Sequence, residues 1–337
     1  MQPSSPQQRI DYLDGWRGLA ICTLLVGHFL PVPGINLGSV GVNLFFVLSG
    51  HLMARILFLQ QMPLGLFYRR RIARIFPASY LFLAIVLALY LPHANPAHYW
   101  DIAAAFGFVY NYMPVHGYAD SGLPIGHLWS LCVEEHSYIL LSLVALAVRP
   151  RQTNPVRYLA GLLVLNVGFM VCYAKGLGWR DIEVYIRSEC ASFSILVSAL
   201  FTLLAARGQL PRLPALAGPL AIGAGIVLHW WSVPALASHT VGIGLIALGF
   251  NLLPQAPAWV RTVLRLRGLR WMGLVSFSVY LWQQPFYHSH LPAWLGLPLA
   301  VLAGAASFYL FENPLRELLN RRWGKPAALV LLEGAAR

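Results

Sequence analysis

Long apolar runs recur along the whole sequence of 337 residues and constrain its fold more than any other feature. Several of them approach the ~20 residues that a helix needs to cross the hydrocarbon core of a bilayer. Hydrophobic residues make up 58% of the chain and charged residues only 11%, whereas a soluble domain carries about a quarter charged residues. The sequence therefore predicts an all-α fold, a polytopic transmembrane helical bundle.

The apolar runs predict about ten spans in a single integral-membrane domain covering residues 1–337, with no appended soluble domain. The stretch 101–114 is too short for a comfortable crossing, so we interpret it as a half-inserted or interfacial helix on the outer side. The first 18 residues are too polar for a signal peptide, which predicts an uncleaved N-terminus. The predicted spans lie near 18–32, 38–59, 75–92, 127–148, 157–175, 188–206, 214–231, 235–253, 271–287 and 293–313.

The distribution of basic residues sets the predicted orientation. A net charge of +12 would indicate nucleic acid in a soluble protein, but here the arginines and lysines gather in short stretches between spans, the positive-inside pattern. We therefore expect a bacterial inner-membrane protein with membrane lipid around it, both termini in the cytoplasm and no nucleic-acid partner. The basic stretches that fall on the cytoplasmic side are 68–74, 149–157, 207–212, 261–270 and 316–325.

Arg17 and His28 place two ionisable side chains in the first span, where each costs several kcal/mol unless it is paired or hydrated. Eleven residues make about three helical turns, so the two side chains share one face and lie ~16 Å apart along the axis. Arg17 is then near the cytoplasmic surface and His28 is well toward the outer half. This pairing favours a polar cavity lining over an isolated structural histidine.

Polar side chains also interrupt the second and fourth spans. Ser49 and Gly50 lie among large apolar residues, where a packing role is at least as favoured as a chemical one. Glu134 and Glu135 are adjacent, and successive helical residues point about 100° apart. We therefore expect one glutamate to face a cavity and the other to pair with a neighbouring helix. The four cysteines show no metal-site spacing, so no metal is expected.

Arg71 and Arg74 lie three residues apart on one helix face, directly before the third span. Two guanidinium groups presented together suit phosphate recognition. A purely topogenic role in a cytoplasmic loop explains them equally well at this point.

Taken together, these segments resemble the acyltransferase-3 family of integral membrane acyltransferases. The resemblance runs through LDGWRGLA, FFVLSGHLM, FYRRRIARIFPASY, HLWSLCVEEHSY, SFSVYLWQQPF and FENPLR. Arg17 and His28 match the family's Arg-x10-His pair, and Arg71 and Arg74 match its Arg-x-x-Arg motif. Glu134 falls on the acidic position of WSL-x-x-E. This chain departs from the pattern at Gln283, where many members have His, which leaves His28 as the main base.

The resemblance implies transfer of an acyl group, usually acetyl from acetyl-CoA, to a hydroxyl of a carbohydrate such as a surface polysaccharide or its lipid-linked precursor. Arg71, Arg74 and Arg17 are then the expected ligands of the CoA phosphates. His28 is the expected general base, and Glu134 the expected partner that orients it. We expect the chain to act on its acceptor unaided or to hand the acyl group to a separate partner.

Other functions stay open at this stage. A transporter or glycan exporter explains the intramembrane charges equally well, and so does a non-catalytic partner in a polysaccharide assembly complex. Within the enzyme interpretation, the acceptor is alternatively a small-molecule sugar such as a macrolide. The sequence does not indicate the oligomeric state.

Overall fold

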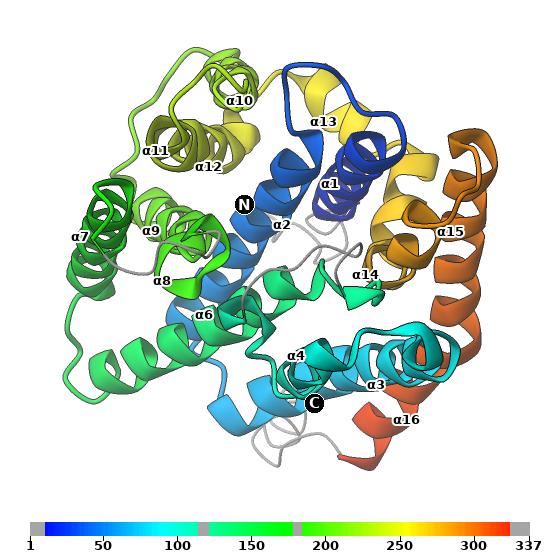
Figure 1. The fold of residues 1–337 in the computed structure, drawn as a ribbon. Helices are drawn as coiled ribbons and strands as arrows, with labels where there is room; N and C mark the ends of the chain where they lie inside the picture. Colours follow the sequence, from blue (N-terminus) through cyan, green and yellow to red (C-terminus); the bar gives the residue numbers. More distant parts are fainter. Residues whose placement is uncertain (1–10, 114–120, 178–183, 324–337) are drawn as a thin grey trace.

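The computed structural model describes residues 11–113, 121–177 and 184–323, and Figure 1 shows them as one assembly of packed helices. Across these residues there is no β-strand, and one isolated bridge joins Ile35 to Trp230. The prediction of an all-α fold is confirmed.

The α-helices differ widely in length, and three π-helical segments continue α2, join α11 to α12 and join α15 to α16. The elements are α1 (Asp11–Phe29), α2 (Leu37–Met53) with η2 (Ala54–Leu59), α3 (Leu64–Tyr90), α4 (Tyr99–Phe106), α6 (Leu128–Val148), α7 (Pro155–Ala174), α8 (Ser188–Ala191), α9 (Phe193–Ala206), α10 (Ala217–Val227), α11 (Ala235–Ala237), η7 (Ser238–Gly242), α12 (Ile243–Leu252), α13 (Ala258–Leu264), α14 (Arg267–Tyr287), α15 (Ala293–Ser307), η9 (Phe308–Glu312) and α16 (Asn313–Arg322).

The protein is a multi-pass membrane protein by the length and composition of its helices. In the described part of the chain, seven helical stretches are long and apolar enough to cross a membrane. The other three predicted spans coincide with α1, α10 and α14, of which α10 has only 11 residues. The count of ten and the side on which the termini lie stay predictions. The seven stretches are Leu37–Leu59, Leu64–His93, Leu128–Val148, Pro155–Ala174, Ser188–Ala206, Ala235–Gln255 and Ala293–Arg322.

Helices α1 and α14 are long but carry more polar residues than the seven apolar stretches. These polar residues are tolerated because protein surrounds much of the surface of both helices. They pack against each other, and α1 also packs along α2 (Figure 1). Their contact depends on glycine: a Cβ at Gly273 would lie 1.8 Å from the carbonyl oxygen of Asp14, and one at Gly18 would lie 1.9 Å from that of Leu269. Glycine therefore lets the two backbones approach closely, as is common between membrane helices.

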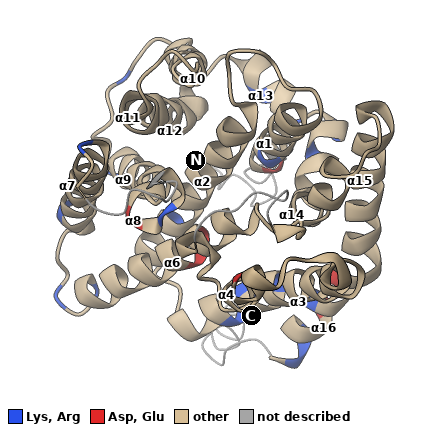
Figure 2. Cartoon of the chain, viewed as in Figure 1, with Lys and Arg blue, Asp and Glu red and all other residues tan. Residues whose placement is uncertain are grey.

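The outer helices present apolar side chains instead. On α7, Val164 is 72% exposed and Leu165 is 58% exposed, and on η9 Leu310 is 81% exposed. Figure 2 shows that Lys, Arg, Asp and Glu occupy only short parts of the helical ribbon. Exposed apolar surface of this kind is suited to lipid rather than to water.

One predicted segment differs from expectation in its local structure, and another agrees with it. The stretch 68–74, predicted as a basic loop, is helical and lies inside α3, because a helix continues into polar sequence that hydropathy excludes from the span. Arginine is a good helix former, so nothing in that stretch ends the helix. The stretch 101–114 forms the 8-residue α4 and a 3₁₀ turn at Tyr110–Tyr112 within its described part, and is not a span.

Substitution of Gly273 by Ala tests the α1–α14 contact. The added methyl group would overlap the carbonyl of Asp14, so we expect a loss of about 1–3 kcal/mol in the free energy of unfolding. Gly268→Ala on the same helix is the matched control, because no atom lies within 4 Å of its added Cβ. Thermal unfolding of the two purified variants in detergent measures the difference. Equal midpoints for both would contradict the close packing of α1 on α14.

Candidate functional site

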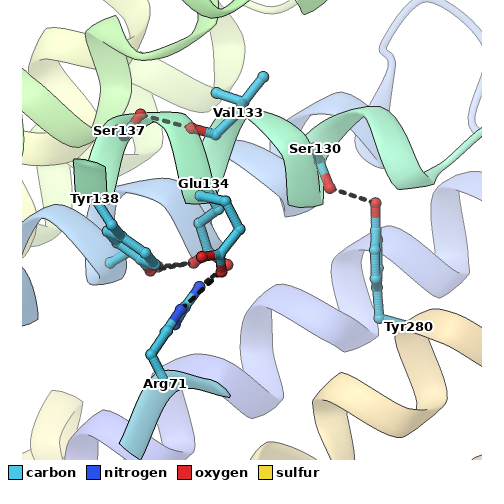
Figure 3. A network of polar contacts seen from close by, with 9 residues as sticks. Arg71, Ser130, Val133, Glu134, Ser137, Tyr138 and Tyr280 are labelled. Atoms are coloured by element: carbon cyan, nitrogen blue, oxygen red, sulfur yellow. Dashed lines mark hydrogen bonds and ion pairs between the residues drawn. The ribbon is translucent and has the colours of Figure 1, made fainter. Parts of the chain in front are cut away.

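A cluster of charged side chains joins α3 to α6 (Figure 3). The Arg71 guanidinium donates from Nη2 to Glu134 Oε2 at 2.8 Å and from Nε to Glu135 Oε1 at 2.9 Å. Only 10% of the Arg71 side chain is exposed, and its Cζ lies 3.9 Å from the centre of the Tyr138 ring. The charge of Arg71 is therefore balanced by two carboxylates of the chain itself.

Glu134 has further partners on its other oxygen. The hydroxyl groups of Ser49 and Tyr138 both donate to Oε1 of Glu134, the latter at 2.7 Å. Glu134 also lines a cavity, whereas Glu135 does not. Glu134 thus faces the cavity, and both carboxylates pair with the same arginine of the neighbouring helix α3.

The cavity beside this cluster, here called the arginine cavity, has a volume of about 290 Å³. Helices α1, α2, α3, α6 and α14 contribute to its wall, which combines charged and hydroxyl groups with large apolar side chains. Its polar lining residues are Arg17, Ser49, Arg71, Arg74, Ser130, Glu134, Tyr138, Ser276 and Tyr280.

The three arginines of this cavity differ in their pairing. Arg17 donates to Asp14 Oδ1 at 2.7 Å, one turn earlier on α1, and Arg71 is held by its two glutamates. Within the described parts of the chain, Arg74 has neither a hydrogen bond nor an ion pair closer than 4.0 Å. Arg74 is therefore the guanidinium that is best able to bind an anion entering the cavity.

A second cavity of about 410 Å³, here called the histidine cavity, lies toward the other end of α1. Four histidines and several amides and aromatic rings line it. Its polar and aromatic lining residues are His28, Asn36, Ser39, Asn43, Phe46, His127, Trp129, Tyr185, Ser194, His239, Tyr280, Gln284 and His288.

His28 is held in one orientation at the wall of the histidine cavity. Its Nδ1 donates to Gln283 Oε1 on α14 at 2.8 Å, and its ring stacks on Tyr287 with centroids 4.8 Å apart. Because an amide carbonyl oxygen only accepts, this bond leaves Nε2 of His28 as an acceptor. Nε2 lies beside Gly38, where a Cβ would approach it to 3.1 Å, so the missing side chain keeps it uncovered.

The two cavities share part of their walls. Val42, Phe46 and Tyr280 line both, so the arginine cavity and the histidine cavity meet at these side chains. Tyr280 is fixed there, because its hydroxyl lies 2.5 Å from Ser130 Oγ (Figure 3) and donates to the carbonyl oxygen of His127 at 2.5 Å. A thin molecule that passes Tyr280 would therefore connect both ends.

The predicted site residues are thus divided between two neighbouring cavities. Arg17, Arg71, Arg74 and Glu134 gather in the arginine cavity, and His28 lies in the histidine cavity. The side chain that bonds to His28 is Gln283, whereas Glu134 bonds to Ser49, Arg71 and Tyr138. The expectation that Glu134 orients the imidazole does not match this geometry, because its oxygens are already bound to other groups.

Sequence reasoning missed two contacts. Tyr138 stands four residues after Glu134, the spacing at which helical side chains meet, so their hydrogen bond could have been predicted from the sequence. Gln283 was noted only as a departure from the common histidine. Its pairing with His28 joins residues 255 positions apart, and periodicity within one helix carries no signal for such a contact.

Comparison with known proteins gives the same assignment for most of the chain. A family model described as an acyltransferase domain matches residues 10–312. The peptidoglycan O-acetyltransferase OatA of Listeria monocytogenes is 25% identical over 90% of this chain and 55% of its own length. The O-acetyltransferase OatA of Staphylococcus aureus is 23% identical over 90% of this chain and 57% of its own length.

The chain spans about half the length of these curated relatives, and no solved structure matches it. The family match covers both cavities and every residue of the predicted site. Sequence, fold and comparison agree, and the chain belongs to the acyltransferase-3 family of integral membrane proteins.

Proposed function

We propose that this protein transfers an acetyl group from acetyl-CoA to a hydroxyl of a cell-surface carbohydrate, at the bacterial inner membrane. The observation that carries the proposal is the shared wall of the two cavities at Val42, Phe46 and Tyr280. It gives one route from a cluster of arginines to an oriented imidazole. Because the relative from Listeria monocytogenes is named for peptidoglycan, we take peptidoglycan as the first acceptor to test.

The anionic end of the donor belongs in the arginine cavity. CoA carries several phosphate charges, and Arg17, Arg71 and Arg74 line this cavity. Arg74 is free of ion pairs among the described residues, whereas Arg71 is already balanced by Glu134 and Glu135. In our proposal Arg74 makes the main phosphate contact, with Arg17 beside it. Arg71 contributes by its positive charge and not by a direct contact.

The thioester end of the donor extends toward His28. Along the axis of α1, His28 lies ~16 Å beyond Arg17, a span suited to the thin, mostly uncharged pantetheine arm. Nε2 of His28 takes the proton of the acceptor hydroxyl as its oxygen attacks the thioester carbonyl carbon. The C–S bond then breaks, and His28 returns the proton to the departing thiolate. The products are an acetyl ester and CoA.

Gln283 and Glu134 act as positioning residues in this scheme. Gln283 accepts from Nδ1 of His28, which fixes the tautomer that leaves Nε2 as base. Glu134 accepts hydrogen bonds from Arg71, Ser49 and Tyr138. It therefore holds these side chains in the wall that the donor must pass.

Replacing Arg74 by Gln tests the phosphate contact. A charge-assisted hydrogen bond contributes about 1.5–3 kcal/mol, so we expect acetyl-CoA affinity to fall by about tenfold or more. Lys at this position should restore only part of the affinity, because it lacks the bidentate fork. Isothermal titration calorimetry at fixed ionic strength measures the dissociation constants. The control is Arg70→Gln, which removes an exposed charge from the same helix outside the cavity; equal affinities for the two variants would count against the site.

Replacing Arg71 by Met tests whether the ion-pair cluster is mainly structural. Removal of the guanidinium alone leaves two carboxylates without a partner, and breaking a buried pair costs about 3–5 kcal/mol of stability. The triple variant Arg71→Met, Glu134→Gln, Glu135→Gln should recover most of that loss. Thermal unfolding of the single and triple variants gives the comparison. A single variant as stable as the parent would refute the cluster's structural role.

Replacing His28 by Gln tests the base. We expect transfer to fall by roughly 10²–10⁴-fold, the usual contribution of a general base, while acetyl-CoA affinity stays within about twofold of the parent. The readout for transfer is the alkali-labile acetyl content of surface carbohydrate in cells expressing each variant. Gln283→Ala should lower transfer less, and Gln283→His should restore part of it, because an imidazole nitrogen can also accept from Nδ1. Near-parent transfer by His28→Gln would eliminate His28 as the base.

A further inference from the structure

A third cavity lies apart from the proposed acyl-transfer route and has no role in it. It occupies about 360 Å³, within the range of small-ligand sites, between the end of η2, the α6–α7 connection and the end of α9. Its lining contains two arginines and no carboxylate. The polar lining residues are Gln61, Arg149, Gln152, Thr153 and Arg207.

Arg149 forms the inner wall of this cavity. Its Nη2 donates to the carbonyl oxygens of Leu57 at 2.8 Å and Met62 at 3.0 Å, which fixes the guanidinium beside η2. Its Nε is buried and has no hydrogen-bond partner in the described part of the chain, and the same holds for Thr153 Oγ1. Buried donors are nearly always paired in folded proteins, so these two call for an acceptor supplied from outside the chain.

The opposite wall adds a second guanidinium and a helix terminus. Arg207 donates from Nη1 to Asn154 Oδ1 at 2.5 Å, and the same Oδ1 accepts from the backbone N–H of Val156 to cap α7. Pro155, the first residue of the 20-residue α7, lines the cavity. The positive end of the helix dipole therefore points toward the same space as Arg149 and Arg207.

The rest of the lining is apolar. Its members are Leu57, Phe58, Leu59, Val148 and Leu203. Of these, Leu59 is 47% exposed on the protein surface. These residues lie near the helix ends that precede the basic stretches 149–157 and 207–212. These stretches are on the predicted cytoplasmic side. The cavity thus combines phosphate-binding groups with an apolar wall at the boundary between membrane and water.

We propose that this cavity binds a phosphate group, that of an anionic lipid headgroup or of a free phosphate. Arg149, Arg207 and the start of α7 supply the positive charge, and Thr153 supplies a hydroxyl donor. A basic cavity between membrane helices on the cytoplasmic side is a recurrent setting for anionic headgroups. An occupant there would tie η2 to α7 and α9.

Binding is tested on the purified full chain in detergent. The probes are phosphatidylglycerol, phosphatidylcholine as the neutral lipid, and inorganic phosphate against chloride at equal ionic strength. We expect phosphatidylglycerol, but not phosphatidylcholine, to raise the thermal unfolding midpoint and to remain bound in native mass spectrometry. An equal rise with inorganic phosphate assigns the site to free phosphate, and a rise with phosphatidylglycerol alone assigns it to lipid.

The variants Arg207→Gln and Thr153→Val remove donors from the cavity without touching the backbone contacts of Arg149. Each should weaken binding of the effective probe, Arg207→Gln by about tenfold. Arg151→Gln is the matched control, because it removes an exposed charge from the same connection but does not line the cavity. If no probe stabilises the parent, or if both variants bind as tightly as Arg151→Gln, the proposal is wrong. Because none of these residues belongs to the acyl-transfer route, the outcome is independent of the proposed function.

Discussion

The bidentate pairing of Arg71 with Glu134 and Glu135 is the interaction on which the proposed site depends most. Three ionisable groups leave water together, which is tolerable only because the guanidinium is bonded to both carboxylates. Ser49 on α2 and Tyr138 on α6 extend the cluster, so it fixes α2, α3 and α6 relative to one another. The same arrangement leaves Arg74, one turn further along α3, beside the cavity with its charge uncompensated by a close partner in the described chain.

The α1–α14 pair then connects the arginine cavity to the histidine cavity. Glycines bring the two backbones together, so that His28 near the end of one helix meets Gln283 near the end of the other. Arg17 projects from the opposite end of α1 into the arginine cavity. A single close helix contact therefore orients the imidazole and also sets its separation from the arginine cavity. Polar residues on these helices lower their hydropathy, and packing within the bundle is what makes those residues tolerable.

The sequence predicted most of the fold but only part of the site. The difference has a physical cause: properties of single helices can be predicted from the sequence, and contacts between helices cannot. Apolar runs located α2, α6, α7 and the α8–α9 segment closely, because lipid imposes length and composition on each span independently. Helix ends were less well predicted at α3, where the helix continues through the arginines of 68–74. Arg17 and His28 lie on one helix, as the sequence predicts, but they line two different cavities. Contacts between elements, such as His28 with Gln283, depend on packing that no single-helix pattern encodes.

In the proposed reaction, the donor enters at the arginine cavity and carries its acyl group past Tyr280 to His28. The most direct test of this route is photo-crosslinking of the purified protein with an acyl-CoA that bears a diazirine at the end of its acyl chain, followed by peptide mass spectrometry. We expect label on segments that line the histidine cavity, which are residues 24–46, 126–129, 185–194, 239–243 and 280–288 together with Met170, and loss of that label with excess CoA. Label confined to α15, which contributes no residue to either cavity, or label that CoA does not displace, would contradict the proposal.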